Sequence, residues 1–294
     1  MDESQWLLER FEEQRPRLRG VAFRMLGSVS EADDALQDAW LRISRADTSD
    51  VENLAGWLTT VVARVCLNLL RTRERRREDP LEVRVPDPII SNQRGVDGEY
   101  EALLADSVGL ALMVVLENLS PAERLAFVLH DMFGVPFDEI ATMLDRTPAA
   151  TRQLASRARR RVQGEATSPD PDLSRQREVV DAFFAASRDG DFDRLVAVLD
   201  PDIVLRSDGG TGRPQLSLLV RGAENVASQA LVATRLAPWV RPALINGAAG
   251  AVVAPHGRPI AVMAFTVADG RIVAIDVLSD SHRLEKLDLS ILDD

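Results

Sequence analysis

The sequence predicts a multidomain protein in which two all-α helical domains are followed by an α+β domain. Three observations support this fold class. The 294 residues are enough for two or three domains. Apolar residues recur with the period of a helix up to about residue 163. From about residue 200 they fall in short runs of strand length, separated by turn residues.

The first helical domain is expected over residues 1–78. Residues 4–45 have the pattern of two amphipathic helices interrupted near Gly27, and Ser30 is the expected N-cap of the second because acids fill its first turn. A third helix is expected from Leu54 to about Arg77. The residues expected on its core face are Leu58, Val61, Val62, Val65 and Leu69.

The opposite side of this third helix carries a basic polar stripe. Residues 57–78 contain six arginines and two acids, and the stripe itself holds no acid. It consists of Thr60, Arg64, Asn68, Arg71 and Arg75. A nucleic-acid contact is favoured over a solvated helix face, because solvated faces usually mix charges of both signs. Trp57 either stacks on an unpaired base or, as is more common at a helix start, packs in the core.

Residues 79–99 form an acidic, proline-containing linker that is expected to be extended. Helical patterning resumes at Tyr100 and defines a second helical domain over residues 100–164. Breaks are expected at Ser120-Pro121, at Gly134 and at Thr147-Pro148.

Residues 137–162 predict a helix-turn-helix. Residues 145–147 form the turn, Thr147 is the N-cap of the second helix, and Pro148 takes its first position. The inward residues are Thr151, Leu154, Ala158 and Val162, and the outward ones are Ala149, Arg152, Gln153, Ser156, Arg157 and Arg160. Arginine, glutamine and serine read base edges in the major groove, and residues 146–161 hold six arginines and no acid, so DNA binding is favoured over an ordinary helix pair.

The α+β domain is expected over residues 173–294. It begins with helices at 178–188 and 191–199. Strand-like runs follow at 203–207, 239–246, 250–255, 260–268 and 271–278, and Asp269-Gly270 is the expected hairpin turn between the last two.

Composition excludes several classes of protein. One cysteine and three scattered histidines leave no disulfide framework, and no metal site or cofactor is expected. The N-terminus lacks the basic-then-apolar order of a secretory signal peptide, and no apolar run is expected to approach the roughly 18 residues needed to span a bilayer. The sequence therefore predicts a cytoplasmic protein without a membrane partner. The net charge of −11 does not exclude nucleic acid, because phosphate contacts depend on local basic patches.

Several of these motifs resemble those of a known family. Residues 17–43, from Arg17-Leu-Arg-Gly to Trp-Leu-Arg-Ile43, and residues 56–64 resemble the sigma-2 region of extracytoplasmic-function (ECF) sigma factors. Residues 119–141, beginning Leu119-Ser-Pro-Ala-Glu-Arg124, and the helix after Thr147 resemble their sigma-4 region. The remainder, with its Asp208-Gly-Gly-Thr-Gly-Arg213 motif, resembles the cone-shaped SnoaL-like (NTF2-like) α+β domain that one subgroup carries.

The resemblance implies a transcription initiation factor that recruits core RNA polymerase to promoter DNA with −10 and −35 elements, and that performs no chemistry. Residues 32–43 would dock on the clamp helices of the polymerase β′ subunit through Asp34, Gln37, Asp38 and Leu41. The Asp47–Asn53 loop would hold a flipped base of the −10 element beside Trp57 and the polar stripe. The outward face of the helix after Thr147 would read the −35 element.

The resemblance also implies that the cone domain modulates the activity of the sigma factor. In the subgroup, the linker carries a Trp-Leu-Pro-acid-Pro motif, which appears here only as Val85-Pro-Asp-Pro88. The subgroup's late Asn-Pro-Asp-Lys string is replaced by Ser279-Asp-Ser-His-Arg283. The residues expected at a regulatory interdomain contact are Asp208, Gly209, Gly210, Arg213, Pro86, Asp87 and Pro88, with the C-terminal tail.

An enzymatic cone domain is the alternative, in a DNA-binding regulator that acts without polymerase and has an isomerase-like, cyclase-like or ligand-binding C-terminal domain. The candidate acid–base groups are Asp208, Asp276, His256 and His282. Each has a plainer interpretation: a turn former, an outward residue on a strand, a hairpin-loop residue and the start of a polar tail, respectively. Whether a small molecule binds this domain stays open.

Overall fold

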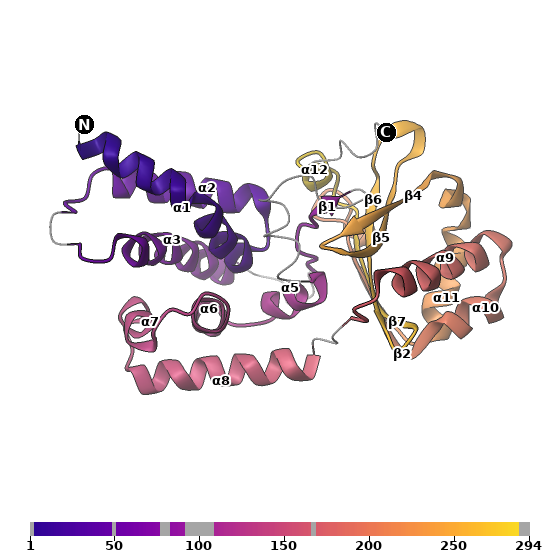
Figure 1. Cartoon of the computed structure of the whole chain (residues 1–294). Coiled ribbons are helices and arrows are strands. Elements are labelled where there is room, and N and C mark those ends of the chain that lie inside the picture. The colour runs from indigo at the N-terminus through magenta and orange to yellow at the C-terminus, as the bar shows by residue number, and fades with distance from the viewer. Residues whose placement is uncertain (1–2, 49–50, 77–82, 92–108, 166–168, 288–294) are drawn as a thin grey trace. The chain divides into compact units, whose positions relative to one another are not determined.

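The computed structural model describes residues 3–48, 51–76, 83–91, 109–165 and 169–287 (Figure 1). The chain divides into two compact units. The helical unit comprises Met1–Pro80 and Val115–Glu165, and the sheet unit comprises Leu81–Val114 and Ala166–Asp294. Helix α5 (Leu110–Glu117) spans the boundary between them.

Three helices form the first part of the helical unit: α1 (Glu3–Leu26), α2 (Val29–Ile43) and α3 (Leu54–Arg76). The three helices pack on one another, and Phe11, Leu36 and Leu58, one from each helix, are each at most 1% exposed. The predicted break near Gly27 is confirmed. The N-cap prediction is wrong: Ser28, not Ser30, caps α2 by accepting a hydrogen bond from the Glu31 amide. The reason is that α1 runs up to Gly27, whose φ of 72° turns the chain straight into α2.

The predicted core face of α3 is largely confirmed. Leu58, Val62 and Val65 are buried, whereas Leu69 is 39% exposed, which contradicts its assignment to the core. Segment Leu54–Arg75 is long and apolar enough to cross a membrane by length and composition alone, which corrects the expectation that no such run exists. A core helix passes the same test, and α3 packs against both α1 and α2.

The second part of the helical unit contains the predicted helix-turn-helix. After α5 come α6 (Pro121–Phe127), the π-helical turn η1 (Val128–Met132), α7 (Phe137–Leu144) and α8 (Pro148–Glu165). All three predicted breaks are confirmed. Asp145 takes a left-handed conformation (φ 54°) after α7, and the Thr147 hydroxyl accepts from the Ala150 amide as the predicted N-cap. Tyr100, where helical patterning was expected to resume, lies outside the described residues.

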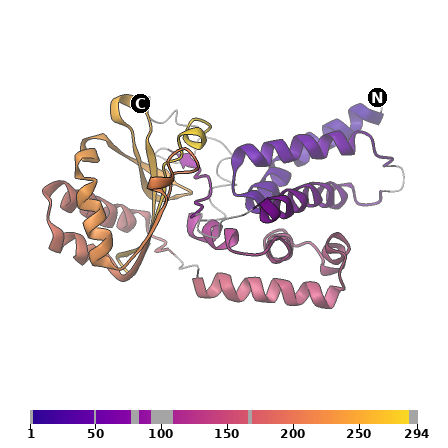
Figure 2. The ribbon, with the colours of Figure 1, turned by 180° about the vertical axis from the view of Figure 1, so that it is seen from behind.

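The sheet unit is a curved seven-stranded sheet with α9 (Leu173–Asp189), α10 (Phe192–Val198) and α11 (Ala223–Val232) on one face (Figure 1 and Figure 2). The strand order is β1-β4-β5-β6-β7-β2-β3, and among the described strands β2 and β7 are the one pair that runs parallel. The strands are β1 (Ile90–Ser91), β2 (Leu199–Asp208), β3 (Leu218–Arg221), β4 (Val240–Ile245), β5 (Ala248–Val253), β6 (Ala261–Ala268) and β7 (Arg271–Leu278).

The core between sheet and helices is filled by aromatic and aliphatic side chains. Phe183, Phe184 and Phe265 meet edge to face, with ring centroids 5.4–5.6 Å apart. Leu195 and Ile275 are at most 1% exposed in the same cluster. The predicted hairpin turn at Asp269 and Gly270 is confirmed, because both have the positive φ that a two-residue turn requires.

Four elements of this unit were not predicted from the sequence: β1, β3, α11 and the short helix α12 (Ser281–Leu284). The unit also contains the short 3₁₀ helices η2 (Pro214–Leu216), η3 (Thr234–Trp239) and η4 (Pro255–Gly257).

The linker is ordered where it is described. Residues 85–91 are all buried, and β1 pairs antiparallel with β4. The Asn246 amide donates to the Ile89 carbonyl at 2.8 Å, and the Ile89 amide donates to the Asn246 side chain at 3.0 Å. The expectation of an extended backbone is correct for this stretch, but the linker is part of the sheet and not a free spacer. The rest of residues 79–99 lies outside the described residues.

Candidate nucleic-acid interfaces and the linker site

The basic stripe of α3 faces solvent within the helical unit. Arg64, Asn68, Arg71 and Arg75 are exposed, as predicted. Thr60 is half-buried, and its hydroxyl donates to the Gly56 carbonyl at 3.0 Å, so it contributes less to the polar surface than the sequence suggested. Trp57 is also half-buried. The expected flipped-base loop, Asp47–Asn53, includes residues 49–50, which lie outside the described residues.

The neighbouring helix α2 presents a mixed acidic and apolar surface. Asp34, Gln37 and Leu41 are exposed, Leu41 to 50%, and Asp38 is half-buried and paired with Arg42 at 2.8 Å. An exposed leucine among carboxylates is a surface that suits a partner with both apolar and basic groups.

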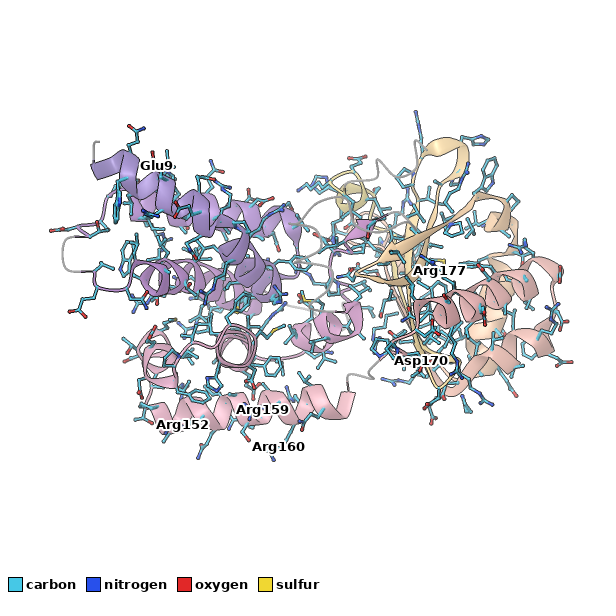
Figure 3. All side chains as sticks on the ribbon, viewed as in Figure 1. Glu9, Arg152, Arg159, Arg160, Asp170 and Arg177 are labelled. Carbon is cyan, nitrogen blue, oxygen red and sulfur yellow. The ribbon has the colours of Figure 1, made fainter. Side chains whose placement is uncertain are left out.

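Helix α8 carries the other basic face. Thr151, Leu154 and Ala158 are buried and Val162 is half-buried, while all six predicted outward residues are exposed. The Arg152 guanidinium lies 5.7 Å from the centre of the Phe137 ring, which links it to α7. Figure 3 shows Arg152, Arg159 and Arg160 along this helix. The arginine-rich segment therefore presents a well-formed face suited to a nucleic-acid groove.

Three arginines of α8 are tied back to the domain by ion pairs. Arg157 pairs with Glu123 at 3.0 Å and Arg161 with the same carboxylate at 3.8 Å. Arg159 pairs with Asp131 at 2.6 Å. Counting arginines along the sequence therefore overstates the number that are free to contact a partner.

A buried ionic cluster joins the two parts of the helical unit. Arg124, 2% exposed, donates to the Arg24 carbonyl at 2.9 Å and pairs with Glu117 at 3.0 Å. Arg24 stacks over the Phe133 ring at 5.2 Å, and burial lowers its pKa to about 10. Gly27 has a φ of 72°, which strains any other residue, and a Cβ there would also lie 2.2 Å from the Glu117 carboxylate. This cluster gave no sequence signal because its members lie about a hundred residues apart.

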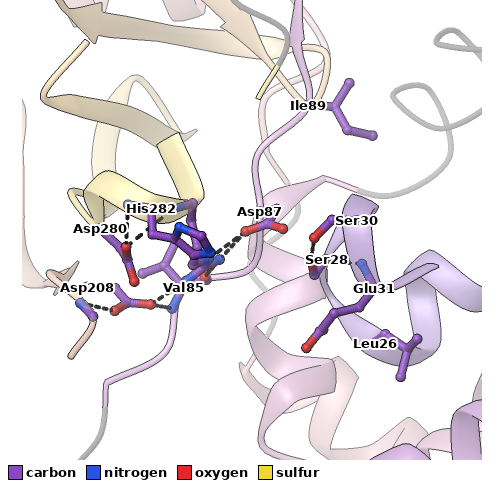
Figure 4. Close-up of polar contacts among 12 residues, drawn as sticks. Leu26, Ser28, Ser30, Glu31, Val85, Asp87, Ile89, Asp208, Asp280 and His282 are labelled. Atoms are coloured by element: carbon purple, nitrogen blue, oxygen red, sulfur yellow. Dashed lines mark hydrogen bonds and ion pairs between the residues drawn. The ribbon is translucent and has the colours of Figure 1, made fainter. Parts of the chain in front are cut away.

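A second buried ionic cluster lies within the sheet unit and holds the linker (Figure 4). Arg283 in α12 pairs with Asp87 at 2.5 Å and with Asp208 at 2.7 Å, and it donates to the Val85 carbonyl at 2.6 Å. The Val85 amide donates to Asp208 at 3.0 Å. Burial alone would lower the pKa of Arg283, but the charges of Asp87 and Asp208 outweigh it and raise the pKa above the ordinary value.

The glycine-rich motif shapes this site. A Cβ at Gly209 would lie 2.1 Å from the Arg213 carbonyl oxygen, and one at Gly210 would lie 1.8 Å from the Asp280 carboxylate. Gly210 also has a positive φ of 62°. Asp208 and Asp87 therefore meet at Arg283, and Gly209 and Gly210 follow Asp208 directly in the chain, whereas Arg213 forms no ion pair among the described residues. The cation of this cluster is Arg283, which lies in the C-terminal segment.

The candidate acid–base groups are scattered. Asp208 is buried in the linker site and is not a simple turn former. Asp276 is only 2% exposed, although it alternates away from the core between sheet and helices as expected, and it pairs with Arg206 at 3.0 Å. Burial raises the pKa of Asp276, and Arg206 offsets only part of that effect. His256 lies in the β5–β6 loop and His282 in α12. Among the described residues, no group of His, Cys, Asp or Glu could hold a metal ion.

Comparison with known proteins identifies the family. Residues 10–76 match the family model of sigma-70 region 2, and residues 109–162 match that of sigma-70 region 4. The ECF RNA polymerase sigma factor SigJ of Mycobacterium tuberculosis is 39% identical over 279 residues, covering 90% of this chain and 89% of SigJ. The chain belongs to the ECF RNA polymerase sigma factors. A probable ECF sigma factor, SigI of the same species, is 35% identical over 93% of each chain.

The crystal structure of M. tuberculosis SigJ extends the match to the whole fold. It aligns with a TM-score of 0.74 at 34% identity and covers 96% of this chain and 99% of the SigJ chain. The predicted fold class, two helical sigma regions followed by an α+β domain, is thereby confirmed.

Two charged residues that organise these sites were not singled out from the sequence. Arg283 stands in the string that replaces the subgroup's late motif, so the departure itself was the available signal. Glu123 lies three residues after Ser120, and this spacing predicts a capping box. The spacing does not predict that Glu123 also pairs with arginines of α8.

Proposed function

We propose that this sigma factor binds core RNA polymerase in the cytoplasm and directs it to promoters with −10 and −35 elements. Residues 1–78 form the sigma-2 domain and residues 100–164 the sigma-4 domain, joined by the linker of residues 79–99. Residues 173–294 form a regulatory domain. The observation that carries this proposal is the pair of exposed arginine faces, one on α3 and one on α8.

Polymerase binding is assigned to the exposed face of α2, formed by Asp34, Gln37, Asp38 and Leu41. The clamp helices of the β′ subunit are the proposed partner. The carboxylates would meet basic groups there, and Leu41 would lose its exposed apolar surface on docking.

The −10 element is assigned to α3. Arg64, Arg71 and Arg75 supply phosphate contacts along one side of the helix, and Asn68 offers donors and acceptors to base edges. Trp57 and Thr60 lie at its start, where a melted base would approach.

The −35 element is assigned to the outward face of α8, comprising Ala149, Arg152, Gln153, Ser156, Arg157 and Arg160. In this assignment Arg152 and Gln153 read base edges in the major groove, and small Ala149 allows close approach.

The cone domain is proposed to regulate these contacts through the linker and to catalyse no reaction. The ionic cluster of Arg283, Asp87 and Asp208, together with the pairing of β1 with β4, fixes residues 85–91 to the domain. Whether this cluster is closed or open therefore determines how freely the linker can extend. Ile275 and Val277 face the core between sheet and helices, so Asp276 between them points to the opposite face. The carboxylate of Asp276 therefore pairs with Arg206 on the far side of the sheet and does not face the core between sheet and helices. Phe183 and Phe265 pack together in that core.

Run-off transcription tests the proposal. Wild-type holoenzyme, reconstituted from core polymerase and the full chain, would first select promoters from a randomised pool. We expect specific initiation by the full chain, and initiation with altered yield by residues 1–165. Failure of the full chain to direct initiation at any sequence would refute the proposed function, and equal yields from both chains would refute the regulatory role of the cone domain.

A further inference from the structure

The carboxylate of Glu123 lies where the start of α6 meets α8. It closes a capping box with Ser120: Oε2 accepts from the Ser120 hydroxyl at 2.8 Å and from the Ser120 amide at 3.3 Å. The Glu123 amide in turn donates to the Ser120 hydroxyl oxygen at 3.4 Å. This arrangement satisfies amide groups at the start of α6. It engages mainly Oε2, which leaves Oε1 for another partner.

That partner is Arg157 of α8, whose Nε donates to Glu123 Oε1 at 3.0 Å. Arg161, one turn later, places Nη1 3.8 Å from Oε2 and donates to the Asn118 carbonyl at 3.3 Å. The side chain of Glu123 is 11% exposed and that of Arg157 is 49% exposed. Glu123 is therefore the fixed member of the pair, and Arg157 is the member that solvent or a ligand can reach.

Glu123 keeps its charge in this setting. Burial alone would raise its pKa, but the hydrogen bonds from Ser120 and Arg157 and the charge of Arg161 outweigh burial, so the pKa lies below its ordinary value. On the other flank of α8, the ion pair between Arg159 and Asp131 holds the helix as well. Recognition helix α8 is thus anchored from both sides.

We propose that Glu123 is a positioning residue for promoter reading: it holds Arg157 against the domain and so limits phosphate contacts that any DNA sequence would satisfy. Phosphate contacts raise affinity for every sequence, whereas base contacts discriminate between sequences. With Arg157 restrained in this way, discrimination between sequences depends mainly on residues of the same outward face that are assigned to base edges, such as Arg152. This inference depends on the proposed binding of α8 to the −35 element.

The test is Glu123→Gln in the full chain, assembled with core polymerase. Glutamine keeps a side-chain oxygen for the Ser120 amide and hydroxyl, so the cap of α6 is retained while the charge that holds Arg157 is removed. Binding is measured from low to high salt on a duplex carrying the −35 element selected by wild-type holoenzyme, and on the same duplex with that element scrambled.

The expected result is a gain of affinity with a loss of selectivity. Affinity for the scrambled duplex rises about two- to fivefold, the range of a partly exposed ion pair. The ratio of selected to scrambled affinity falls, and the log–log salt slope steepens by about 0.9, because one more phosphate is neutralised. A second substitution, Arg157→Gln, in the Glu123→Gln background should restore the wild-type slope.

Glu139→Gln is the matched control, because Glu139 is an exposed acid in the first turn of α7 with the same charge and no ion pair among the described residues. Equal effects of Glu123→Gln and Glu139→Gln would overturn the inference, since they would reflect net charge alone. Loss of binding to both duplexes with a lower melting temperature would also overturn it, in favour of a purely structural role. Wild-type holoenzyme that ignores the −35 sequence would instead refute the proposed function.

Discussion

Replacing Arg283 with alanine should release the linker from the cone domain. The substitution removes the partner of two carboxylates, Asp87 and Asp208, whose side chains are each 7% exposed. It also removes a hydrogen bond to the Val85 carbonyl at 2.6 Å. Arg283→Lys is the graded variant, since a lysine keeps the charge but lacks the fork that spans both carboxylates.

The structure sets the size of the expected effect. Removing one member of a buried ion pair typically costs about 3–5 kcal/mol. Arg283 is 18% exposed, so water partly solvates the site and the lower end, about 3 kcal/mol, applies. At about 1.4 kcal/mol per factor of ten, opening of the linker becomes about a hundredfold more frequent. Arg283→Lys should fall between wild type and alanine.

Hydrogen exchange of peptides that cover residues 83–91 measures this opening directly. The Val85 amide donates to Asp208 and the Ile89 amide to Asn246, so both should exchange faster in Arg283→Ala. Arg206→Ala is the matched control, because Arg206 also pairs with a buried carboxylate of this domain, that of Asp276. Unchanged exchange over residues 83–91 in a folded Arg283→Ala protein, or equal acceleration in the control, would refute the reasoning.

Four further outcomes follow from single sites. Arg152→Ala should weaken holoenzyme binding to the selected −35 duplex by about 1–3 kcal/mol and leave the scrambled duplex unaffected; an equal loss on both would mean a phosphate contact only. Arg124→Met should lower the free energy of unfolding of the helical unit by about 3–5 kcal/mol in urea titrations, because it strips a buried ion pair of its cation. Cys66 is fully buried and its thiol pKa is raised to about 12, so iodoacetamide should label it only as the protein unfolds, and rapid labelling of the native chain would contradict the fold. Burial raises the pKa of Asp276, so the folded protein keeps the carboxyl proton of Asp276 to a higher pH than the unfolded chain does. The contribution of this group to the free energy of unfolding is therefore lost as the pH rises through the raised pKa. Asp276→Asn, which cannot ionise, should therefore gain stability relative to wild type as the pH rises from about 4 to 7, measured by thermal unfolding at each pH.

Elements with strong local signals could be predicted from the sequence. Helix α8 was placed by Thr147, Pro148 and the helical period, and the β6–β7 turn by Asp269-Gly270, because each feature depends on neighbours in the chain. β1 could not be predicted. Its hydrogen-bond partners lie in β4, more than 150 residues later, so the local sequence showed only a proline-rich stretch.

In the candidate sites, too, features set by local sequence could be predicted, and features set by contacts between distant elements could not. The outward faces of α3 and α8 follow from periodicity alone, and their exposure in the structure matches the pattern at most positions. The pairings of Arg157 with Glu123 and of Arg283 with Asp87 depend on how separate elements pack. Sequence spacing therefore identified the residues on each surface but not which of their charges are already neutralised.

The chain contains a single lysine, so arginine supplies the positive charge both in the buried ion pairs and on the exposed helix faces. A guanidinium presents five donors in a planar fork, so it can join two carboxylates or a carboxylate and a carbonyl in a buried site, as Arg283 and Arg124 do. The same fork on an exposed helix face, as at Arg152, can meet a guanine edge. Because arginine serves both in buried ion pairs and on exposed helix faces, basic charge counted along the sequence locates the two helices that we propose face DNA. The acids packed beside each arginine determine which of these arginines remain available to a partner.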